Sequence, residues 1–532
     1  NSRVGSSLKV KSSPKQHFFF RHGVVGLMKR AHGKIDNVPK VVLAPGLEIS
    51  RVVNGLWQVA DLERRGGLGL NLDAALIDLK AAHAAGFTSF DMADHYGSAE
   101  ELLAHLPDFQ AFTKWVPKPG SENSSCEAVD AAVQRSLIRM KRQRLDLLQF
   151  HTWDYLDGPG TWIKQLHTLQ DHVGVAHLGV TNFDTGHVQL ALASGIRLVS
   201  NQICFSLLDR RALGPMRDLC KASGMKILAF GVLAGGLLSD RFLRRGPPTD
   251  SELESSWSLA KYNRFVVCFG GWELFQELLE TLRRVADRHI VTEDDGREVP
   301  VSIANVATRW ILDCEEVAAI LVGARLGHSE HVKDNKRVFQ FSLSFEDNQD
   351  IELVLRKSKP IPGDCGDEYR RPPFLTASGD LSHHLSEVPN AFQATQLPGH
   401  STEIPRLMVG PQMSDSERDR GGCGAMRIGS RVSVSGTKSM MNGAVVGGDD
   451  PEAQTTFTLD LIEAMLKALG ASLSDVFRIR VYVPRAEHCE QVKRACRHRF
   501  VGSHYPANTI LHAAFDGDPR NLVCIDAEAE VL

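Results

Sequence analysis

Four polar side chains of different types follow three separate apolar runs in the first third of the chain. Asp91 and Tyr96 stand five residues apart in FDMADHYGSAE, directly after the apolar run GFTSF. Lys114 closes AFTK, and His151 closes LDLLQFH. If the four converge, the lysine ammonium lowers the pKa of the tyrosine from its ordinary value of about 10, and the aspartate holds the lysine in place. These residue types therefore suit proton transfer.

The same four residues fit the reduction of a carbonyl group. Tyr96 could protonate a carbonyl oxygen, while His151 hydrogen-bonds that oxygen and fixes its orientation. A proton donor reduces nothing alone, so a hydride source must lie nearby. Taken singly, each side chain also has a structural explanation, such as a helix cap or a satisfied core histidine. Asp94 and His95 receive no predicted role, and Ser98 is the expected N-cap of the next helix.

Short apolar runs alternate with longer amphipathic segments from about residue 43 to 340, which predicts strands alternating with helices. Eight such units predict a parallel α/β fold, here a (β/α)8 TIM barrel, whose carboxyl-terminal rim would gather the four polar residues. A doubly wound sheet is the alternative, but no G-x-G-x-x-G opens the first helix. The expected strands are SRVVNGLW, TSFDM, AFTKWV, LDLLQFH, AHLGVTN, RLVSNQ, KILAFGVL and VAAILVGA.

This region resembles the aldo-keto reductase family. GFTSFDMADHYGSAE is similar to the family's second-strand signature, FTKW supplies its lysine and LDLLQFH its histidine. The resemblance implies a catalytic tetrad of Asp91, Tyr96, Lys114 and His151. It further implies an NAD(P)H-dependent oxidoreductase that reduces an aldehyde or ketone to an alcohol, or the reverse, with Tyr96 as proton donor.

The resemblance also implies a cofactor site, usually for NADP, with NAD as the alternative. LGVTNF and SNQ match positions that bind the nicotinamide carboxamide, LAFGVLAGGLL carries the stacking aromatic, and LVGARLGHSEHVKDN matches the adenosine phosphate segment. His331 replaces an arginine found in some members, so the NADP preference rests on Arg325. The implied cofactor residues are Thr181, Asn182, Gln202, Phe230, Gly231, Leu233, Gly323, Arg325, Ser329 and Asn335.

Beyond about residue 405 the order of elements changes to strand, helix, strand, helix and two strands, which predicts a small α+β domain. This region resembles the reactive intermediate deaminase family, also called YjgF-like or endoribonuclease L-PSP, which implies a chorismate mutase-like fold and trimers. The family's substrate-binding arginine is Asn508 here, and Asp526 represents its usual carboxylate. Because asparagine cannot make the bidentate charged contact of arginine, oligomerisation or ligand binding is favoured over imine hydrolysis.

The predicted domains are a basic tail or transit peptide over 1–40, the barrel with an extension over 41–385, a linker over 386–404 and the second domain over 405–532. The stretch 239–270 is too long for an ordinary barrel loop and is predicted as an insertion beside the rim. Together with the extension, it would shape the substrate pocket.

The composition narrows the possible partners. A net charge of −3 argues against nucleic-acid binding, and no apolar run approaches the roughly 20 residues of a membrane helix. The ten cysteines form no CxxC pair, so no metal module or disulfide framework is predicted, and a reducing compartment fits best. We expect a soluble homo-oligomer acting on a small carbonyl or alcohol in the cytoplasm, or in a plastid or mitochondrion if the tail is a transit peptide.

Two other functions remain open from the sequence. The protein could be a regulatory module that senses the nicotinamide cofactor, or a bifunctional enzyme whose second domain removes a reactive imine or enamine.

Overall fold

The computed structural model describes residues 38–370, 394–396, 406–409 and 423–531, apart from short gaps at 65–69, 107, 118–124, 153, 157–159, 294–295, 325, 327–330, 501–504 and 516. The basic tail and most of the predicted linker lie outside the described residues, so the transit-peptide prediction is not tested.

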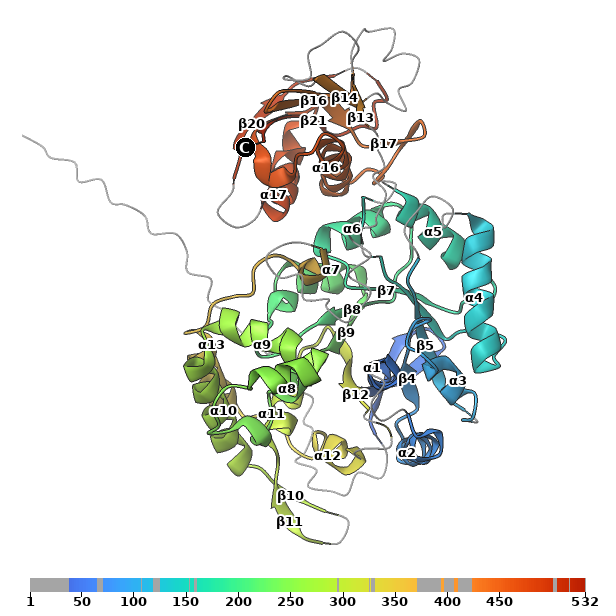
Figure 1. Ribbon diagram of the computed structural model, residues 1–532, viewed down its shortest axis with the longest axis vertical. Helices are drawn as coiled ribbons and strands as arrows, with labels where there is room; N and C mark the ends of the chain where they lie inside the picture. The colour runs from blue at the N-terminus through green and yellow to red at the C-terminus, as the bar shows by residue number, and fades with distance from the viewer. Residues whose placement is uncertain are drawn as a thin grey trace, which may run out of the picture.

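The eight predicted strands form one closed parallel barrel, with the last strand pairing with the first (Figure 1). This arrangement confirms the (β/α)8 prediction over the doubly wound alternative. The barrel strands are β3 (Val52–Gly55), β4 (Ser89–Asp91), β5 (Gln110–Trp115), β6 (Leu147–Phe150), β7 (Leu178–Thr181), β8 (Ser200–Cys204), β9 (Lys226–Phe230) and β12 (Val317–Gly323).

Helices surround the barrel because the outward face of each strand is apolar. The helices of this region are α1 (Trp57–Arg64), α2 (Leu72–Ala84), α3 (Ala99–Leu103), α4 (Cys126–Met140), α5 (Thr161–Gln170), α6 (Thr185–Ala193), α7 (Pro215–Ser223), α10 (Trp272–Asp287), α11 (Ile303–Leu312), α12 (Val332–Arg337) and α13 (Phe345–Leu355). Two hairpins lie outside the barrel, β1 (Lys40–Ala44) with β2 (Leu47–Ser50), and β10 (Ile290–Thr292) with β11 (Glu298–Pro300).

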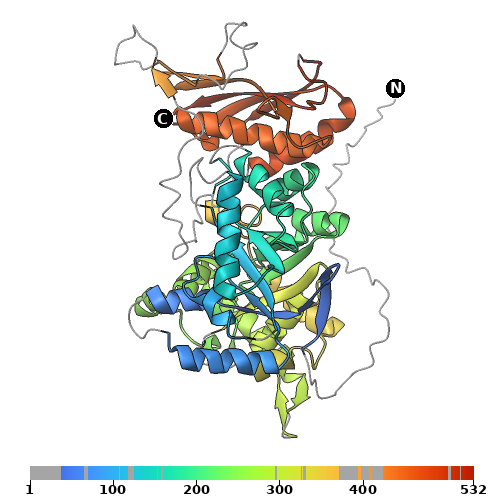
Figure 2. The same cartoon turned by 90° about the vertical axis from the view of Figure 1, so that its right-hand side faces the viewer.

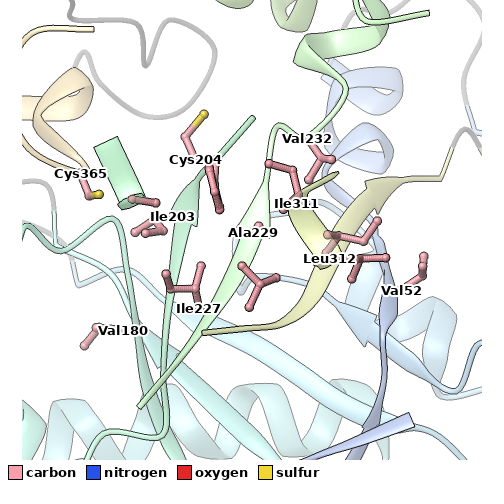
Figure 3. Close-up of a cluster of buried hydrophobic side chains, with 14 of the residues drawn as sticks. Val52, Val180, Ile203, Cys204, Ile227, Ala229, Val232, Ile311, Leu312 and Cys365 are labelled. Carbon is pink, nitrogen blue, oxygen red and sulfur yellow. The ribbon is translucent and has the colours of Figure 1, made fainter. Parts of the chain in front are cut away.

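Strand alternation divides the barrel into two cores, because successive side chains point to opposite faces of a sheet. Val52, Ile227 and Ala229 pack outward, and the helical Ile311 lies in the same cluster (Figure 3). Leu228, between two of these residues, faces a separate inner cluster with Phe112 and Leu147, to which the β1–β2 hairpin also contributes. Because the outer face packs against the helices, a polar side chain at the rim of the barrel must belong to the inner face.

The predicted insertion 239–270 contains two helices, α8 (Asp250–Ser255) and α9 (Trp257–Phe269). Ser256 caps α9 through a side-chain hydrogen bond to the Leu259 N–H. The extension after α13 ends in the short helix α14 (Asp367–Arg370). Tyr369 of α14 accepts a hydrogen bond from Lys261 of α9, so the insertion and the extension meet.

The second domain has a seven-stranded sheet in the order β13-β14-β15-β16-β21-β19-β20. The expected strands and both expected helices are present, which confirms the small α+β fold. Its elements are β13 (Ala394–Gln396), β14 (Arg406–Val409), β15 (Ala425–Ile428), β16 (Arg431–Lys438), β17 (Met440–Met441), β18 (Ala444–Val445), α16 (Pro451–Ala468), β19 (Val476–Val483), α17 (Cys489–Arg499), β20 (Ala507–His512) and β21 (Cys524–Glu530).

The domain boundary differs from the predicted one. Strand β13 lies inside the predicted linker 386–404 and pairs antiparallel with β14. Three residues carry too little local pattern to predict a strand, and the pairing with β14 is what defines it. The sheet of the second domain therefore begins before residue 405.

The two domains dock through helices. Figure 2 shows α16 and α17 lying between the sheet of the second domain and the barrel. Phe457 and Ala453 of α16 belong to the same hydrophobic cluster as the outer core of the barrel. The helical face of the second domain is thus buried against the barrel. Among the described residues, no helix combines the length and the apolar character needed to cross a membrane.

Candidate active site

The four candidate catalytic residues come from the carboxyl-terminal ends of three neighbouring strands. Asp91 is the last residue of β4, Lys114 is the last but one of β5, and His151 follows β6. Tyr96 stands in the loop after β4. Because Phe90 and Leu148 face the outer core, alternation turns Asp91 and Gln149 into the barrel. The residues therefore share one rim.

A buried ion pair forms the base of the site. Lys114 Nζ lies 2.5 Å from Asp91 Oδ2 and donates a second hydrogen bond of 2.9 Å to the Met92 carbonyl. The side chains are 2% and 4% exposed. Asp91 Oδ1 accepts hydrogen bonds from Gln149 Nε2 at 2.9 Å and Gln202 Nε2 at 2.7 Å. The aspartate thus fixes the lysine, as the sequence predicts.

Tyr96 lies beside this lysine. Lys114 Nζ is 5.0 Å from the centroid of the Tyr96 ring, within the range of a cation–π contact. The His95 ring packs edge-on against Tyr96 at 4.9 Å and bonds Asp94 at 3.0 Å. Asp94 and His95, which have no role in the sequence prediction, therefore form one wall around the tyrosine.

His151 is neutral at ordinary pH. Its pKa is lowered well below 6.5, first by burial and then by charge interactions with Arg370, His95 and Lys114. A neutral imidazole can hydrogen-bond a substrate oxygen without adding a charge to the site. The ring lies 3.4 Å from the Asn182 side-chain amide, measured from Nε2 to Nδ2.

Two of the implied carboxamide-binding residues present unused polar atoms. Thr181 ends β7 and Asn182 follows it, with both residues buried. Thr181 Oγ1 and Asn182 Oδ1 have no hydrogen-bond partner among the described residues. Buried polar atoms are usually paired, so this pair of acceptors is consistent with a ligand that carries hydrogen-bond donors, such as a carboxamide. Asn182 also has a positive φ of 57°, a conformation that asparagine tolerates better than most residues.

Four other implied cofactor residues lie in or directly after β8 and β9. Gln202 is in β8, Phe230 ends β9 and Gly231 follows with a φ of 70°. Leu233 comes two residues after Gly231. The Gln202 amide nitrogen is engaged by Asp91, so only its oxygen remains for the carboxamide.

The adenosine phosphate end is described in part. Gly323 ends β12 and pairs with Gly55 of β3. Asn335 lies in α12. Arg325 and Ser329 lie outside the described residues, so the placement of these two predicted residues is not tested.

Sequence reasoning missed the residues that cover the rim. Tyr369 of the extension packs edge-on against His151 at 5.7 Å between centroids. Lys261 Nζ lies 5.2 Å from the Phe230 ring and 2.5 Å from the Tyr369 hydroxyl. No local pattern marks either residue. Gln149, by contrast, could have been found, because it precedes His151 by two positions and alternation places both on the inner face.

The set of groups on this rim fits a nicotinamide cofactor. It offers unused buried acceptors at the end of β7 and an aromatic ring, Phe230, at the end of β9. Tyr96, the candidate proton donor, stands on the same rim. These groups would hold a planar amide-bearing ring next to the tyrosine.

Models of two known protein families match this chain. The model of the Aldo/keto reductase family matches residues 51–356, and that of Endoribonuclease L-PSP matches residues 423–531. Flagellar radial spoke protein 5 of Chlamydomonas reinhardtii is 32% identical over 250 residues, covering 41% of this chain and 44% of that protein. The chain thus spans less than half the length of that relative.

Bacterial enzymes are matched over more of their own length. L-glyceraldehyde 3-phosphate reductase of Escherichia coli K12 is 26% identical over 314 residues, covering 54% of this chain and 84% of the enzyme. The solved structure of a glycerol dehydrogenase from Gluconobacter oxydans is 22% identical with a TM-score of 0.49, and the match covers 62% of this chain and 98% of that one.

The family model covers more than half of the chain, and the fold and the convergent rim agree with it. The chain belongs to the aldo/keto reductase family, and it is an oxidoreductase that carries a C-terminal domain of the endoribonuclease L-PSP type.

Proposed function

We propose that the protein reduces an aldehyde or ketone to an alcohol, or catalyses the reverse reaction, with NADP as the preferred nicotinamide cofactor. The observation that carries the proposal is the buried Asp91–Lys114 pair lying beside Tyr96 at the ends of two adjacent strands. The cofactor supplies the hydride when it is bound. The chain's own residues bind the substrate oxygen and deliver the proton.

Each residue of the site has a separate task in this proposal. Tyr96 donates its phenolic proton to the substrate oxygen as charge develops there, and Lys114 stabilises the resulting phenolate. Asp91 holds Lys114, and the neutral His151 orients the carbonyl group. Thr181 and Asn182 bind the nicotinamide carboxamide, with Gln202 as the third contact.

The preference for NADP over NAD is an inference from Arg325. The remaining proposed cofactor contacts are Phe230, Gly231, Leu233, Gly323, Ser329 and Asn335. A panel of aldehydes and ketones, followed by nicotinamide absorbance with NADPH and with NADH, measures both the substrate class and this preference. Higher turnover with NADH than with NADPH throughout the panel would contradict the preference for NADP.

The Tyr96→Phe variant tests the assignment of Tyr96 as the proton donor. General acid catalysis contributes on the order of 10²- to 10⁴-fold, so we expect kcat to fall at least about 10²-fold. The dissociation constant for NADPH should change little, because the ring remains. Tyr482→Phe, in the second domain, is the matched control and should keep the wild-type rate. Turnover of the Tyr96→Phe variant at the wild-type rate would refute the assignment.

The second domain is not proposed to hydrolyse imines. Asn508 lies in β20, where the family's arginine is expected, and Asp526 is already bonded to Arg480 Nη1 at 2.9 Å and to the Tyr482 hydroxyl at 2.9 Å. Both oxygens of the Asp526 carboxylate are therefore already engaged within the domain. Assembly into a homo-oligomer remains a prediction, which the molar mass measured by light scattering would check.

A cofactor-sensing role is the alternative, and a binding assay combined with the substrate panel distinguishes it from catalysis. It predicts tight binding of NADPH without turnover of any compound in the panel.

A further inference from the structure

The interface between the domains contains a buried charged cluster. It lies between α6 of the barrel, which begins three residues after Asn182, and α16 and α17 of the second domain. Its members are His187, Asp184, Asp460, Glu463 and Arg499. His187 is 1% exposed, as is Asp460. Charges this deeply buried are costly unless they are closely paired.

His187 is clamped between carboxylates of both domains. Its Nδ1 lies 2.7 Å from Asp184 Oδ2, and its Nε2 lies 3.1 Å from Asp460 Oδ2. Asp460 is in turn held by Arg499 at 2.7 Å. With an acceptor at each ring nitrogen, the doubly protonated imidazolium satisfies both contacts, whereas a neutral imidazole can donate to only one.

On the barrel side, His187 supports an aromatic ring. Tyr155 stacks on the His187 ring with centroids 3.4 Å apart and an angle of 9° between the planes. The guanidinium of Arg370 lies 4.2 Å from the Tyr155 ring. A cation at this distance from a tyrosine is attracted to its π-system, so the tyrosine locates the arginine.

Arg370 then fixes the backbone beside the candidate catalytic and cofactor residues. Its Nη2 donates to the Thr152 carbonyl at 2.6 Å, directly after His151, and its Nη1 donates to the Asn182 carbonyl at 2.5 Å. Asn182 holds a positive φ, which costs free energy unless its surroundings stabilise it. The guanidinium supplies part of that stabilisation.

We infer that Asp460 and His187 are positioning residues of the oxidoreductase site, acting through Tyr155 and Arg370, so that the second domain is a working part of this site. The inference rests on the proposed function for its catalytic readout. It assigns to the second domain a role other than ligand chemistry or oligomerisation. A charge contributed by Asp460 orders the loops that carry His151 and Asn182.

The test uses the full-length protein with Asp460→Asn, which keeps the shape of the side chain and removes its charge. The matched control is Gln189→Ala, because Gln189 donates to Asp450 at 2.8 Å across the same pair of helices and lies outside the Tyr155–Arg370 path. Misplacement of reacting groups by a fraction of an ångström to 1 Å costs up to about 10²-fold. We therefore expect kcat to fall on the order of tenfold in Asp460→Asn and less than about twofold in the control.

A second readout needs no turnover. Titration of NADPH fluorescence should give a dissociation constant raised several-fold in Asp460→Asn and unchanged in Gln189→Ala. Wild-type kcat and NADPH affinity in Asp460→Asn, together with a lowered melting temperature, would show that the cluster only holds the domains together and would overturn the inference. Absence of NADPH binding by the wild-type protein would instead refute the proposed function.

A pair of variants inside the barrel keeps the inference testable if Asp460→Asn does not fold. Tyr155→Leu removes the stacked ring and leaves both ion pairs of His187 in place, and it should reproduce the loss of kcat and of NADPH affinity. Tyr155→Phe retains the ring and should recover most of both. Equal behaviour of the two variants would show that the stacked ring does not transmit the effect.

Discussion

At the scale of single residues, the Asp91–Lys114 ion pair is the buried charge pair at the base of the candidate site. Both side chains are almost fully buried, and the aspartate accepts hydrogen bonds from two glutamines in addition to the lysine. Such a pair contributes less to net stability than its geometry suggests, because both charges lost their hydration on folding. Removing only one of the two charges lowers the stability, since the charge that remains is buried without a partner of opposite sign.

We expect Lys114→Met to lower the free energy of unfolding of the barrel by about 3–5 kcal/mol, the usual cost of an uncompensated buried charge. The double variant Lys114→Met with Asp91→Asn should recover part of this loss because no charge is left behind. Neither variant should be active. Urea unfolding followed by circular dichroism measures the difference. A double variant no more stable than Lys114→Met would contradict the explanation.

At the scale of elements, the extension after α13 is the segment that completes the rim. Arg211 anchors it by donating a hydrogen bond of 2.7 Å to the Asp364 carbonyl and by forming an ion pair with the Glu368 carboxylate at 2.8 Å. Gly366 then packs so closely that a Cβ would collide with the carbonyl of Asn182. Its φ of 80° also favours glycine. The extension is therefore in direct contact with the loop after β7.

Gly366→Ala tests that close contact. Gly224→Ala is the matched control, because Gly224 has nearly the same φ of 78° and no atom within 4 Å of the position that a Cβ would take. Backbone strain costs each variant about 1–2 kcal/mol. Only Gly366→Ala should also raise the NADPH dissociation constant and lower kcat, because only that Cβ displaces Asn182. Equal NADPH affinity in the two variants would show that the extension does not control the β7 loop.

At the scale of the whole molecule, we expect the docking of the two domains to depend on the charge of His187. Burial lowers the pKa of His187, but the charges of Asp184 and Asp460 and their hydrogen bonds outweigh it, so that the pKa is raised above 6.5. A group whose pKa is raised on folding stabilises the folded state below its unfolded value and loses that contribution as the pH rises through the folded value. The contribution of His187 should therefore be complete below about pH 6.5 and absent well above its raised pKa.

Hydrogen exchange of α6 and α16 measures this dependence. Opening of these helices should become easier as the pH rises through the raised pKa of His187, after correction for the intrinsic pH dependence of exchange. His187→Gln should lack that step, because glutamine has no charge to lose. A wild-type profile without the step would contradict the assigned charge state.

Local pattern was sufficient for the fold of each domain and for the placement of the tetrad on one rim. Alternation of apolar runs marks strands, and the order of strands and helices in a parallel barrel brings every strand end to the same face. Asp91, Lys114 and His151 could therefore be grouped before any contact was known. The same reasoning did not find β13, whose three residues become a strand only by pairing with β14.

The covering of the rim and the docking of the domains were decided by the tertiary structure alone. Arg370 bonds the backbone of Asn182 across 188 positions of sequence, and His187 meets Asp460 across 273. Periodicity reports which face of an element is apolar, but it carries no information about which distant element supplies the matching charge. The sequence by itself determined the barrel, the second domain and the candidate chemistry. Long-range packing decided which side chains hold that chemistry in place.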